Sequence, residues 1–347
     1  MRAAHEAALA GHTTYTHTAG VPELRQAIGA KVHDLQGVTY EPSEIICTVG
    51  GTMAIYLAIR AFIGAGDNAV IISPAYAIYV NGVAMAGGEA RQVPLATDGN
   101  RFTLDLERIA RAIDSRTRMI VVNSPSNPTG WMITGAEQRA LADLAAKHDL
   151  VILSDEVYER LAFDVEVNTP VAPSFARVCE SPADRDRLVV VNSFSKTYNM
   201  TGWRLGWAQA SERTIRLMYS AAEFITSNPT AMVQQAGIAA LRDGEESVRE
   251  MRAHLSARRA QVAEGFSALP HLSLVEPQGA FYAFVRIDGL TDSAELATRL
   301  VREAGVAVAP GSAFGPGGEG YLRLCLAVRE GTLAEALDRL RAHAAFN

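Results

Sequence analysis

The stretch from residue 193 to residue 207 reads SFSKTYNMTGWRLGW. It follows the apolar run 188–191, which predicts a buried strand. Lys196 is therefore expected just past the carboxyl end of that strand, where open α/β sheets bind their ligands. A lysine on an apolar, partly enclosed turn loses its proton readily, and the neutral amine can form a Schiff base with an aldehyde cofactor.

Hydroxyl and guanidinium groups surround this lysine in the sequence. Ser193 and Ser195 precede it, and Arg204 follows eight residues on. A guanidinium binds phosphate through two parallel hydrogen bonds, so these residues indicate a cofactor that carries a phosphate. The alternative is a lysine in a polar surface loop, where most lysines lie. The neighbouring residues favour the cofactor site.

The same stretch resembles the cofactor-lysine segment of the class I/II aminotransferases, which are pyridoxal 5′-phosphate enzymes of fold type I. The resemblance covers nearly the whole chain. It implies that Lys196 is the catalytic lysine, that Ser193, Ser195 and Arg204 bind the cofactor phosphate, and that the enzyme is a homodimer. It also implies a large domain, with a mostly parallel central sheet covered by helices, and a smaller α+β C-terminal domain. We expect a short N-terminal segment at 1–20, the large domain at 21–245 and the small domain at 246–347.

Length and composition are consistent with this fold. The 347 residues suffice for two domains, because single cores rarely grow beyond roughly 250–300 residues. A net charge of −6 and a pI near 5.8 argue against nucleic acid or an anionic membrane as the main partner. No signal peptide and no apolar run of about 18 residues is found, so we expect a cytoplasmic protein that does not span a membrane.

The cysteine pattern excludes a metal site of the usual kind. Cys47, Cys179 and Cys325 form no pair with metal-binding spacing, and two of them lie in apolar runs. We expect buried free thiols in a reducing compartment, and no metal.

Strand and helix patterns alternate along the first part of the chain, which predicts a mainly parallel sheet covered on both faces. A long helix that joins the domains is expected at 246–269, followed by shorter elements. Strands are predicted at 45–49, 69–72, 93–95, 119–123, 150–153, 272–275, 306–308 and 321–327. Further helices are predicted at 52–62, 104–113, 136–148 and 292–304.

A glycine turn lies between the strand predicted at 45–49 and the helix predicted at 52–62. Unpaired N–H groups and the helix dipole make such a turn an anion site, although a glycine pair alone is usually only a turn. The resemblance places the cofactor phosphate here, with backbone N–H groups from Gly51, Thr52 and Met53.

Two further segments are assigned by the resemblance. Tyr76, two residues after Pro74, is placed against the face of the cofactor ring, with core packing as the alternative. Asn127 lies in the loop SPSNPTG at 124–130, which two prolines hold rigidly. The resemblance implies that Asn127 donates to the 3′-oxygen of the cofactor and helps to place the substrate.

Asp155 follows the strand predicted at 150–153 by two residues, and a buried acid at the end of a strand needs a cationic partner. The resemblance pairs it with the protonated pyridine nitrogen and places Tyr158 at the 3′-oxygen, opposite Asn127. A helix cap is the alternative role for Asp155. Glu156 is interpreted as structural.

Arg323 lies in the middle of an apolar strand pattern, sharing one face with Tyr321 and Cys325, and needs an anion or an acid to face. The resemblance assigns it to the substrate α-carboxylate; an internal ion pair is the alternative. Tyr15 is assigned to the cofactor phosphate of the partner subunit, with packing as the alternative. The resemblance also implies an N-terminal arm, which we expect either to be missing or to precede residue 1.

The predicted function is pyridoxal-phosphate-dependent transfer of the amino group of an L-amino acid to a 2-oxo acid such as 2-oxoglutarate, by a ping-pong mechanism. Aspartate, aromatic and other neutral amino acids remain open as donors, because no arginine is assigned by motif to a distal carboxylate. A C–S β-lyase or a synthase on the same fold is the main alternative, since fold alone does not determine the reaction. The second alternative is a non-catalytic module of the same fold that binds an effector.

Overall fold

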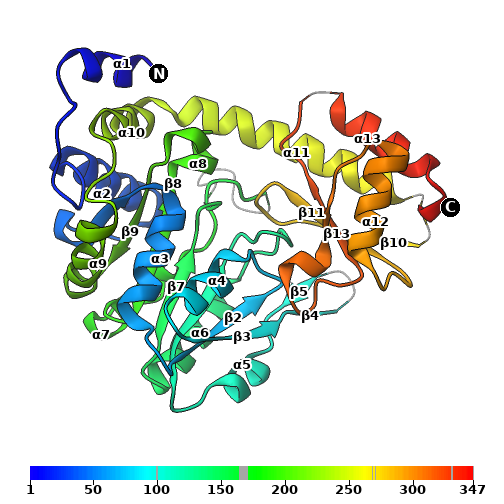
Figure 1. Ribbon diagram of the computed structural model, residues 1–347, viewed down its shortest axis with the longest axis horizontal. Coiled ribbons are helices and arrows are strands. Elements are labelled where there is room, and N and C mark those ends of the chain that lie inside the picture. The colour runs from blue at the N-terminus through cyan, green and yellow to red at the C-terminus, as the bar shows by residue number, and fades with distance from the viewer. Residues whose placement is uncertain (99–100, 164–170, 268, 270, 330, 347) are drawn as a thin grey trace.

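A computed structural model describes residues 1–98, 101–163, 171–267, 269, 271–329 and 331–346. Two sheets form two layered units, and the long helix α11 (Glu245–Ser267) runs from one to the other along one side of the molecule (Figure 1). The larger unit contains the N-terminal two thirds of the chain, and the smaller unit contains the C-terminal part (Figure 1).

The large sheet has the strand order β1-β9-β8-β7-β6-β2-β3. Only β9 runs antiparallel to its neighbours, so the sheet is mostly parallel, as predicted. Its strands are β1 (Ile45–Thr48), β2 (Asn68–Ser73), β3 (Glu89–Pro94), β6 (Thr117–Asn123), β7 (Val151–Asp155), β8 (Leu188–Ser193) and β9 (Gly206–Ala210).

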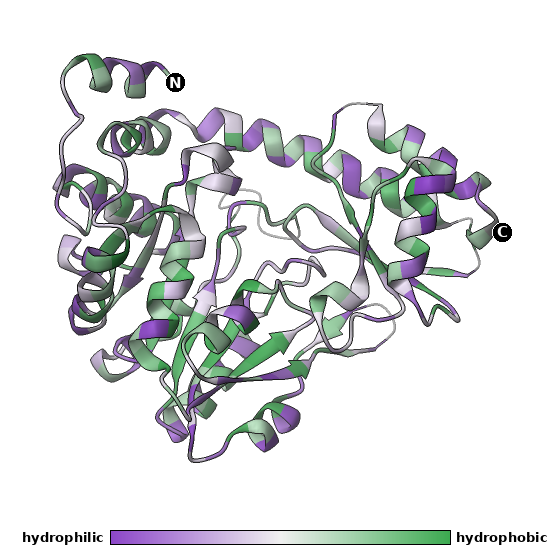
Figure 2. Ribbon diagram, in the orientation of Figure 1, coloured by the Kyte–Doolittle hydropathy of each residue, from purple (hydrophilic) through white to green (hydrophobic). Residues whose placement is uncertain are grey.

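Helices cover both faces of this sheet, which explains why its central strands are apolar throughout. Alternate residues of one strand enter two different cores: Val189 and Val191 of β8 face one, and Val190 faces the other. The central strands are accordingly hydrophobic along their length in Figure 2. The helices of this unit are α1 (Arg2–Leu9), α2 (Pro22–Gln36), α3 (Gly50–Phe62), α4 (Ile78–Met85), α5 (Leu106–Ala112), α6 (Gly135–Lys147), α7 (Pro182–Arg185), α8 (Phe194–Thr197), α9 (Glu212–Ile225) and α10 (Ala231–Asp243).

The small sheet is antiparallel, in the order β10-β11-β13-β12. Helices α11 to α13 pack beside it (Figure 1). A two-stranded hairpin, β4 (Ala96–Thr97) with β5 (Phe102–Thr103), lies outside both sheets. The remaining elements are β10 (Leu272–Val275), β11 (Tyr282–Ile287), α12 (Ser293–Arg299), β12 (Ala309–Pro310), β13 (Tyr321–Cys325) and α13 (Thr332–Ala342).

Two expectations need correction, and a third extends beyond the described residues. The strand predicted at 306–308 lies instead at 309–310, where it pairs with Arg323 and Leu322 of β13. The helix predicted at 292–304 ends in a π-helical turn over Leu300–Ala304. The helix predicted at 246–269 is described to Ser267, and residue 268 lies outside the described residues.

The prediction of buried thiols is right for two cysteines and wrong for the third. Cys47 and Cys179 are buried, whereas Cys325 is exposed. Strand alternation explains the difference, because Leu322 and Leu324 take the core face of β13 and leave Cys325 on the opposite face. Among the described helices, none combines the length and apolarity needed to cross a membrane.

Candidate active site

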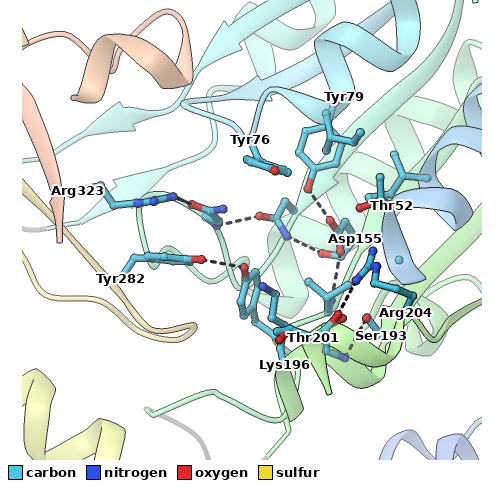
Figure 3. A pocket seen from close by; sticks show the side chains of 18 residues that line it. Thr52, Tyr76, Tyr79, Asp155, Ser193, Lys196, Thr201, Arg204, Tyr282 and Arg323 are labelled. Carbon is cyan, nitrogen blue, oxygen red and sulfur yellow. Dashed lines mark hydrogen bonds between the residues drawn. The ribbon is translucent and has the colours of Figure 1, made fainter. Parts of the chain in front are cut away.

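A cavity of about 360 Å³ opens at the carboxyl ends of the parallel strands and is closed on one side by the small sheet (Figure 3). Its walls come from both units of the fold. The lining residues are Gly51, Thr52, Ile55, Tyr76, Ile78, Tyr79, Asn123, Asn127, Asp155, Val157, Tyr158, Ser193, Ser195, Lys196, Thr201, Arg204, Tyr282 and Arg323.

Most of the predicted site residues therefore meet in one place, although they span the chain from residue 51 to residue 323. Two do not line the cavity. The Met53 side chain packs against the apolar core, and Tyr15 lies 87% exposed along a separate surface hollow. The proposed contact of Met53 uses its backbone N–H, and that of Tyr15 reaches the partner subunit, so neither position contradicts the prediction.

Lys196 reaches the cavity from α8, a single helical turn that starts directly after β8. Ser193 caps this turn, because its Oγ accepts a hydrogen bond from the Ser195 N–H at 3.1 Å. The Lys196 Nζ lies 5.7 Å from the centre of the Tyr158 ring and 5.5 Å from that of Phe281. Burial lowers the pKa of Lys196, and the charge of Asp155 opposes this effect. The site thus favours a neutral amine.

Asp155 lies at the end of β7 with 4% of its surface exposed. Its Oδ1 accepts a hydrogen bond from the Val157 N–H at 3.2 Å, and its Oδ2 accepts one from the Tyr79 hydroxyl at 2.5 Å. Burial raises the pKa of Asp155 to about 6, while the two hydrogen bonds and Lys196 lower it. Residues 157–160 form turns rather than a helix, so Asp155 does not cap a helix.

The opposite side of the cavity combines a cation with a helix N-terminus. Arg204 adopts a left-handed conformation (φ 53°) and donates from Nη1 to the Thr201 carbonyl at 2.9 Å. Its guanidinium lies over the start of α3, where a Cβ at Gly50 would come 2.5 Å from Nη2. The guanidinium carries a positive charge, and the helix N-terminus carries a partial positive charge. An anion bound between them would interact favourably with both.

Arg323 lies on the small-domain side of the cavity, opposite Arg204 (Figure 3). Its Nη1 donates to the Asn127 Oδ1 at 2.8 Å. The guanidinium carbon lies 4.4 Å from the centre of the Tyr282 ring and 4.9 Å from that of Phe314. Within the described part of the chain no carboxylate pairs with Arg323, so the alternative of an internal ion pair is not observed. Its buried Nε also has no partner.

Sequence reasoning missed four polar residues of the site, Asn123, Tyr79, Thr201 and Tyr282. Asn123 donates to the Asp155 carbonyl at 2.9 Å and accepts from the Asn127 N–H at 2.8 Å, which ties two neighbouring strand ends together. Tyr79 contacts Asp155, and Tyr282 contacts Tyr158 at 3.3 Å between hydroxyls. The position of Tyr79, three residues after the predicted site residue Tyr76, is the sequence signal for it.

Comparison with known proteins agrees with this geometry. The family described as aminotransferase class I and II matches residues 1–340. The chain belongs to this family. It is 37% identical over 342 residues to an aspartate aminotransferase of Pyrococcus abyssi, covering 97% of this chain and 85% of the relative. It is 36% identical over 341 residues to aromatic-amino-acid aminotransferase 2 of Thermococcus litoralis, covering 97% and 85%.

Solved structures lead to the same family. The aromatic aminotransferase of Pyrococcus horikoshii superposes with a TM-score of 0.91 at 35% identity, covering 98% of this chain and 90% of that one. This class I/II aminotransferase is therefore a transaminase of fold type I, in a family whose members use pyridoxal phosphate. Among the described residues, no group of His, Cys, Asp or Glu side chains could hold a metal ion.

Proposed function

We propose that this aminotransferase binds pyridoxal phosphate on Lys196 and transfers the amino group of an L-amino acid to a 2-oxo acid such as 2-oxoglutarate, by a ping-pong mechanism. The observation that carries the proposal is one cavity in which a proton-losing lysine lies near a buried acid, between two arginines on opposite sides. The two arginines match the two anionic ends of a cofactor–substrate pair, a phosphate and a carboxylate.

The polar residues of the cavity match the functional groups of pyridoxal phosphate. Arg204, the hydroxyls of Ser193 and Ser195, and the backbone N–H groups of Gly51, Thr52 and Met53 would hold the phosphate. Tyr76 would lie against the ring. Asn127 and Tyr158 would meet the 3′-oxygen, and Asp155 would keep a proton on the pyridine nitrogen. When bound, pyridoxal phosphate supplies an electron sink for the carbanion formed at the substrate Cα.

On the substrate side, Arg323 would bind the α-carboxylate and so fix the direction of the Cα–H bond. Its position between the Tyr282 and Phe314 rings limits its movement, and Asn127 holds one of its nitrogens. The lowered pKa of Lys196 makes its amine a suitable base for the Cα proton. Once protonated, the same Lys196 amine would be the acid that gives this proton back, so one residue would serve as both base and acid.

The relatives are named for aspartate and for aromatic amino acids, and we propose these and other neutral amino acids as donors. All three cations of the cavity, Lys196, Arg204 and Arg323, already have roles. A dicarboxylate donor would need a further cation from another subunit. A panel of amino donors, scored in the first half-reaction by loss of the visible absorbance of the lysine-bound cofactor, ranks these donors.

We also propose a cytoplasmic homodimer, with Tyr15 donating to the cofactor phosphate of the partner subunit. The high exposure of Tyr15 supports this role, because in the single chain its ring packs on little else. The domain boundaries proposed are 1–20, 21–245 and 246–347, and α11 starts one residue before the last of these segments, at Glu245.

The experiment that tests the proposal is borohydride reduction followed by peptide mapping. The sequence contains lysine only at positions 31, 147 and 196, so the label has few possible side-chain sites. We expect a reduced pyridoxyl group on Lys196, and Lys196→Ala should remove both the label and turnover. Lys31→Arg and Lys147→Arg are matched controls that should retain both. A label on another amine, or full turnover by Lys196→Ala, would refute the assignment. Release of pyruvate and ammonia without a 2-oxo acid would indicate the lyase reaction.

A further inference from the structure

Tyr79 makes the shortest contact to the buried acid of the site that the described residues show. The residue lies in the first turn of α4 and is 2% exposed, and its hydroxyl donates to the Asp155 Oδ2 at 2.5 Å. Figure 3 shows the ring above Asp155, on the side of the carboxylate away from Lys196. The contact joins α4 to the end of β7 across the base of the cavity.

The hydrogen bonds of Asp155 divide its two oxygens. Oδ1 is bound by a backbone N–H of its own segment, that of Val157, whereas Oδ2 is bound by the side chain of Tyr79 from a different element. A carboxylate has about four acceptor sites, so both oxygens retain capacity toward the cavity that Asp155 lines. The two donors thus fix the plane of the carboxylate without saturating it.

A packing role alone would not require the hydroxyl. The Tyr79 ring belongs to the apolar core that contains α3 and α4, and phenylalanine would fill the same space. Burial and the charge of Asp155 raise the pKa of Tyr79 well above its usual value, so the hydroxyl keeps its proton. A neutral phenol beside a carboxylate donates that proton into the hydrogen bond, and such a bond favours the ionised acid.

We propose that Tyr79 is a positioning residue that holds Asp155 ionised and oriented toward the pyridine nitrogen of the cofactor. The inference rests on the proposed function, in which Asp155 keeps that nitrogen protonated. This role requires no contact between Tyr79 and the cofactor or the substrate. Tyr79 acts through the charge of Asp155.

Other groups near Asp155 define what remains when the hydroxyl is removed. Lys196 on α8 and the Val157 N–H favour the ionised acid, and burial opposes it. Tyr158 after β7 and Tyr76 before α4 are the other titratable side chains close by, and Arg204 and Arg323 lie at the ends of the cavity. Without the Tyr79 hydroxyl, fewer interactions offset the effect of burial on the pKa of Asp155. Asp155 should therefore take up a proton at higher pH.

The test measures cofactor affinity against pH in Tyr79→Phe. The probes are pyridoxal 5′-phosphate and pyridoxine 5′-phosphate, which lacks the aldehyde and so reports binding without the bond to Lys196. In the wild type we expect binding to weaken as the pH falls through about 6, where Asp155 gains its proton. In Tyr79→Phe the midpoint should move up by about one pH unit, with near-normal affinity in alkaline solution. Tyr40→Phe, which removes another buried hydroxyl, should leave the midpoint unchanged.

Several outcomes would overturn the inference. The first is an unchanged pH midpoint in folded Tyr79→Phe. The second is an equal loss of cofactor affinity at every pH, which would show that Tyr79 acts by packing alone. In an Asp155→Asn background, adding Tyr79→Phe should change the pH profile no further, and a further shift would also contradict the proposal. If Tyr79→Phe does not fold, a fluorinated tyrosine at position 79, a stronger donor, should move the midpoint down, and no movement would refute the role. Failure of the wild type to bind pyridoxal phosphate would instead reject the proposed function.

Discussion

At the scale of single residues, Glu156 shows how strongly its surroundings act on an acid next to the site. It follows Asp155 directly but faces away from the cavity, where its Oε1 accepts from the Ser154 hydroxyl at 2.8 Å and from the Phe175 N–H at 3.1 Å. Burial, with the charge of Glu159, raises the pKa of Glu156 to about 8. Glu156 is therefore uncharged at neutral pH.

This raised pKa predicts a pH-dependent stability. Between its ordinary value of 4.5 and about 8, Glu156 binds a proton in the folded chain but not in the unfolded chain. The free energy of unfolding should therefore fall as the pH rises through that window. One pKa unit corresponds to about 1.4 kcal/mol, so the loss amounts to a few kcal/mol.

Glu156→Gln should flatten this fall, because the amide keeps an acceptor oxygen and has no proton to lose. Urea unfolding of the cofactor-free protein at pH 5, 6.5 and 8 measures the effect. The exposed Glu107→Gln on α5 is the control and should follow the wild-type curve. Parallel curves for wild type and Glu156→Gln would show that Glu156 does not carry the titration.

The residues that the sequence identified are those whose segment is itself distinctive. Lys196, Asp155 and Asn127 each follow an apolar strand and lie in a recognisable motif. Tyr79 and Tyr282 lie in no such motif. Their contacts to Asp155 and Tyr158 depend on how α4 and β11 pack against β7, which local sequence does not encode.

At the scale of elements, the proposed anion site depends on how closely β9 approaches α3. A Cβ at Gly206, the first residue of β9, would lie 2.5 Å from the Gly51 nitrogen and 2.7 Å from the Gly50 carbonyl carbon. Backbone atoms cannot move aside as a flexible side chain can. The close approach of β9 to the glycine turn is therefore possible only because residue 206 has no side chain.

Gly206→Ala should separate the two elements. We expect a loss of about 1–3 kcal/mol in the free energy of unfolding, the usual range for overpacking, together with weaker binding of pyridoxal phosphate. Gly202→Ala is a matched control in the neighbouring turn, because a Cβ there meets no atom within 4 Å. Urea unfolding and a cofactor titration measure both effects. Equal stabilities for the two variants would show that the contact relaxes without cost.

Element types followed from the sequence, whereas strand order did not. The runs at 119–123 and 188–191 were apolar enough to predict strands buried on both faces. The antiparallel strand β9 follows β8 in the chain, but it also pairs with β1, whose residues lie far away in the sequence. Such pairing is decided by the packing of whole elements, so no local pattern revealed it. The short β12 was misplaced for a similar reason, since its partner strand determines its bounds.

At the scale of the whole molecule, the two units are fastened at the start of α11. Glu245, the first residue of this helix, pairs with Lys31 of α2 at 2.9 Å and with the buried Arg160 of the segment after β7. Burial opposes ionisation of Glu245, and the two cations outweigh it, so its pKa falls to about 2. The joining helix is thus anchored on the large unit by its first residue.

One side of the large unit exposes apolar side chains that a single chain leaves uncovered. Tyr15 is 87% and Phe224 88% exposed, and Leu217 and Phe224, seven residues apart, lie on one face of α9. Tyr15 and Ile225 line the same surface hollow. Exposed apolar patches of this kind mark interaction sites, which supports the proposed homodimer.

The two roles proposed for this surface can be tested separately by two substitutions. Phe224→Asp places a charge in the apolar patch, so we expect monomers by sedimentation velocity and weaker pyridoxal phosphate binding, because each site loses the partner's hydroxyl. Tyr15→Phe should leave the dimer intact and weaken the binding of pyridoxal phosphate roughly tenfold. This is the effect of losing one charge-assisted hydrogen bond of about 1.5 kcal/mol. Met85→Asp, on an exposed residue of α4, is the control and should alter neither property. A Phe224→Asp monomer with full cofactor affinity would mean that each subunit builds its phosphate site alone.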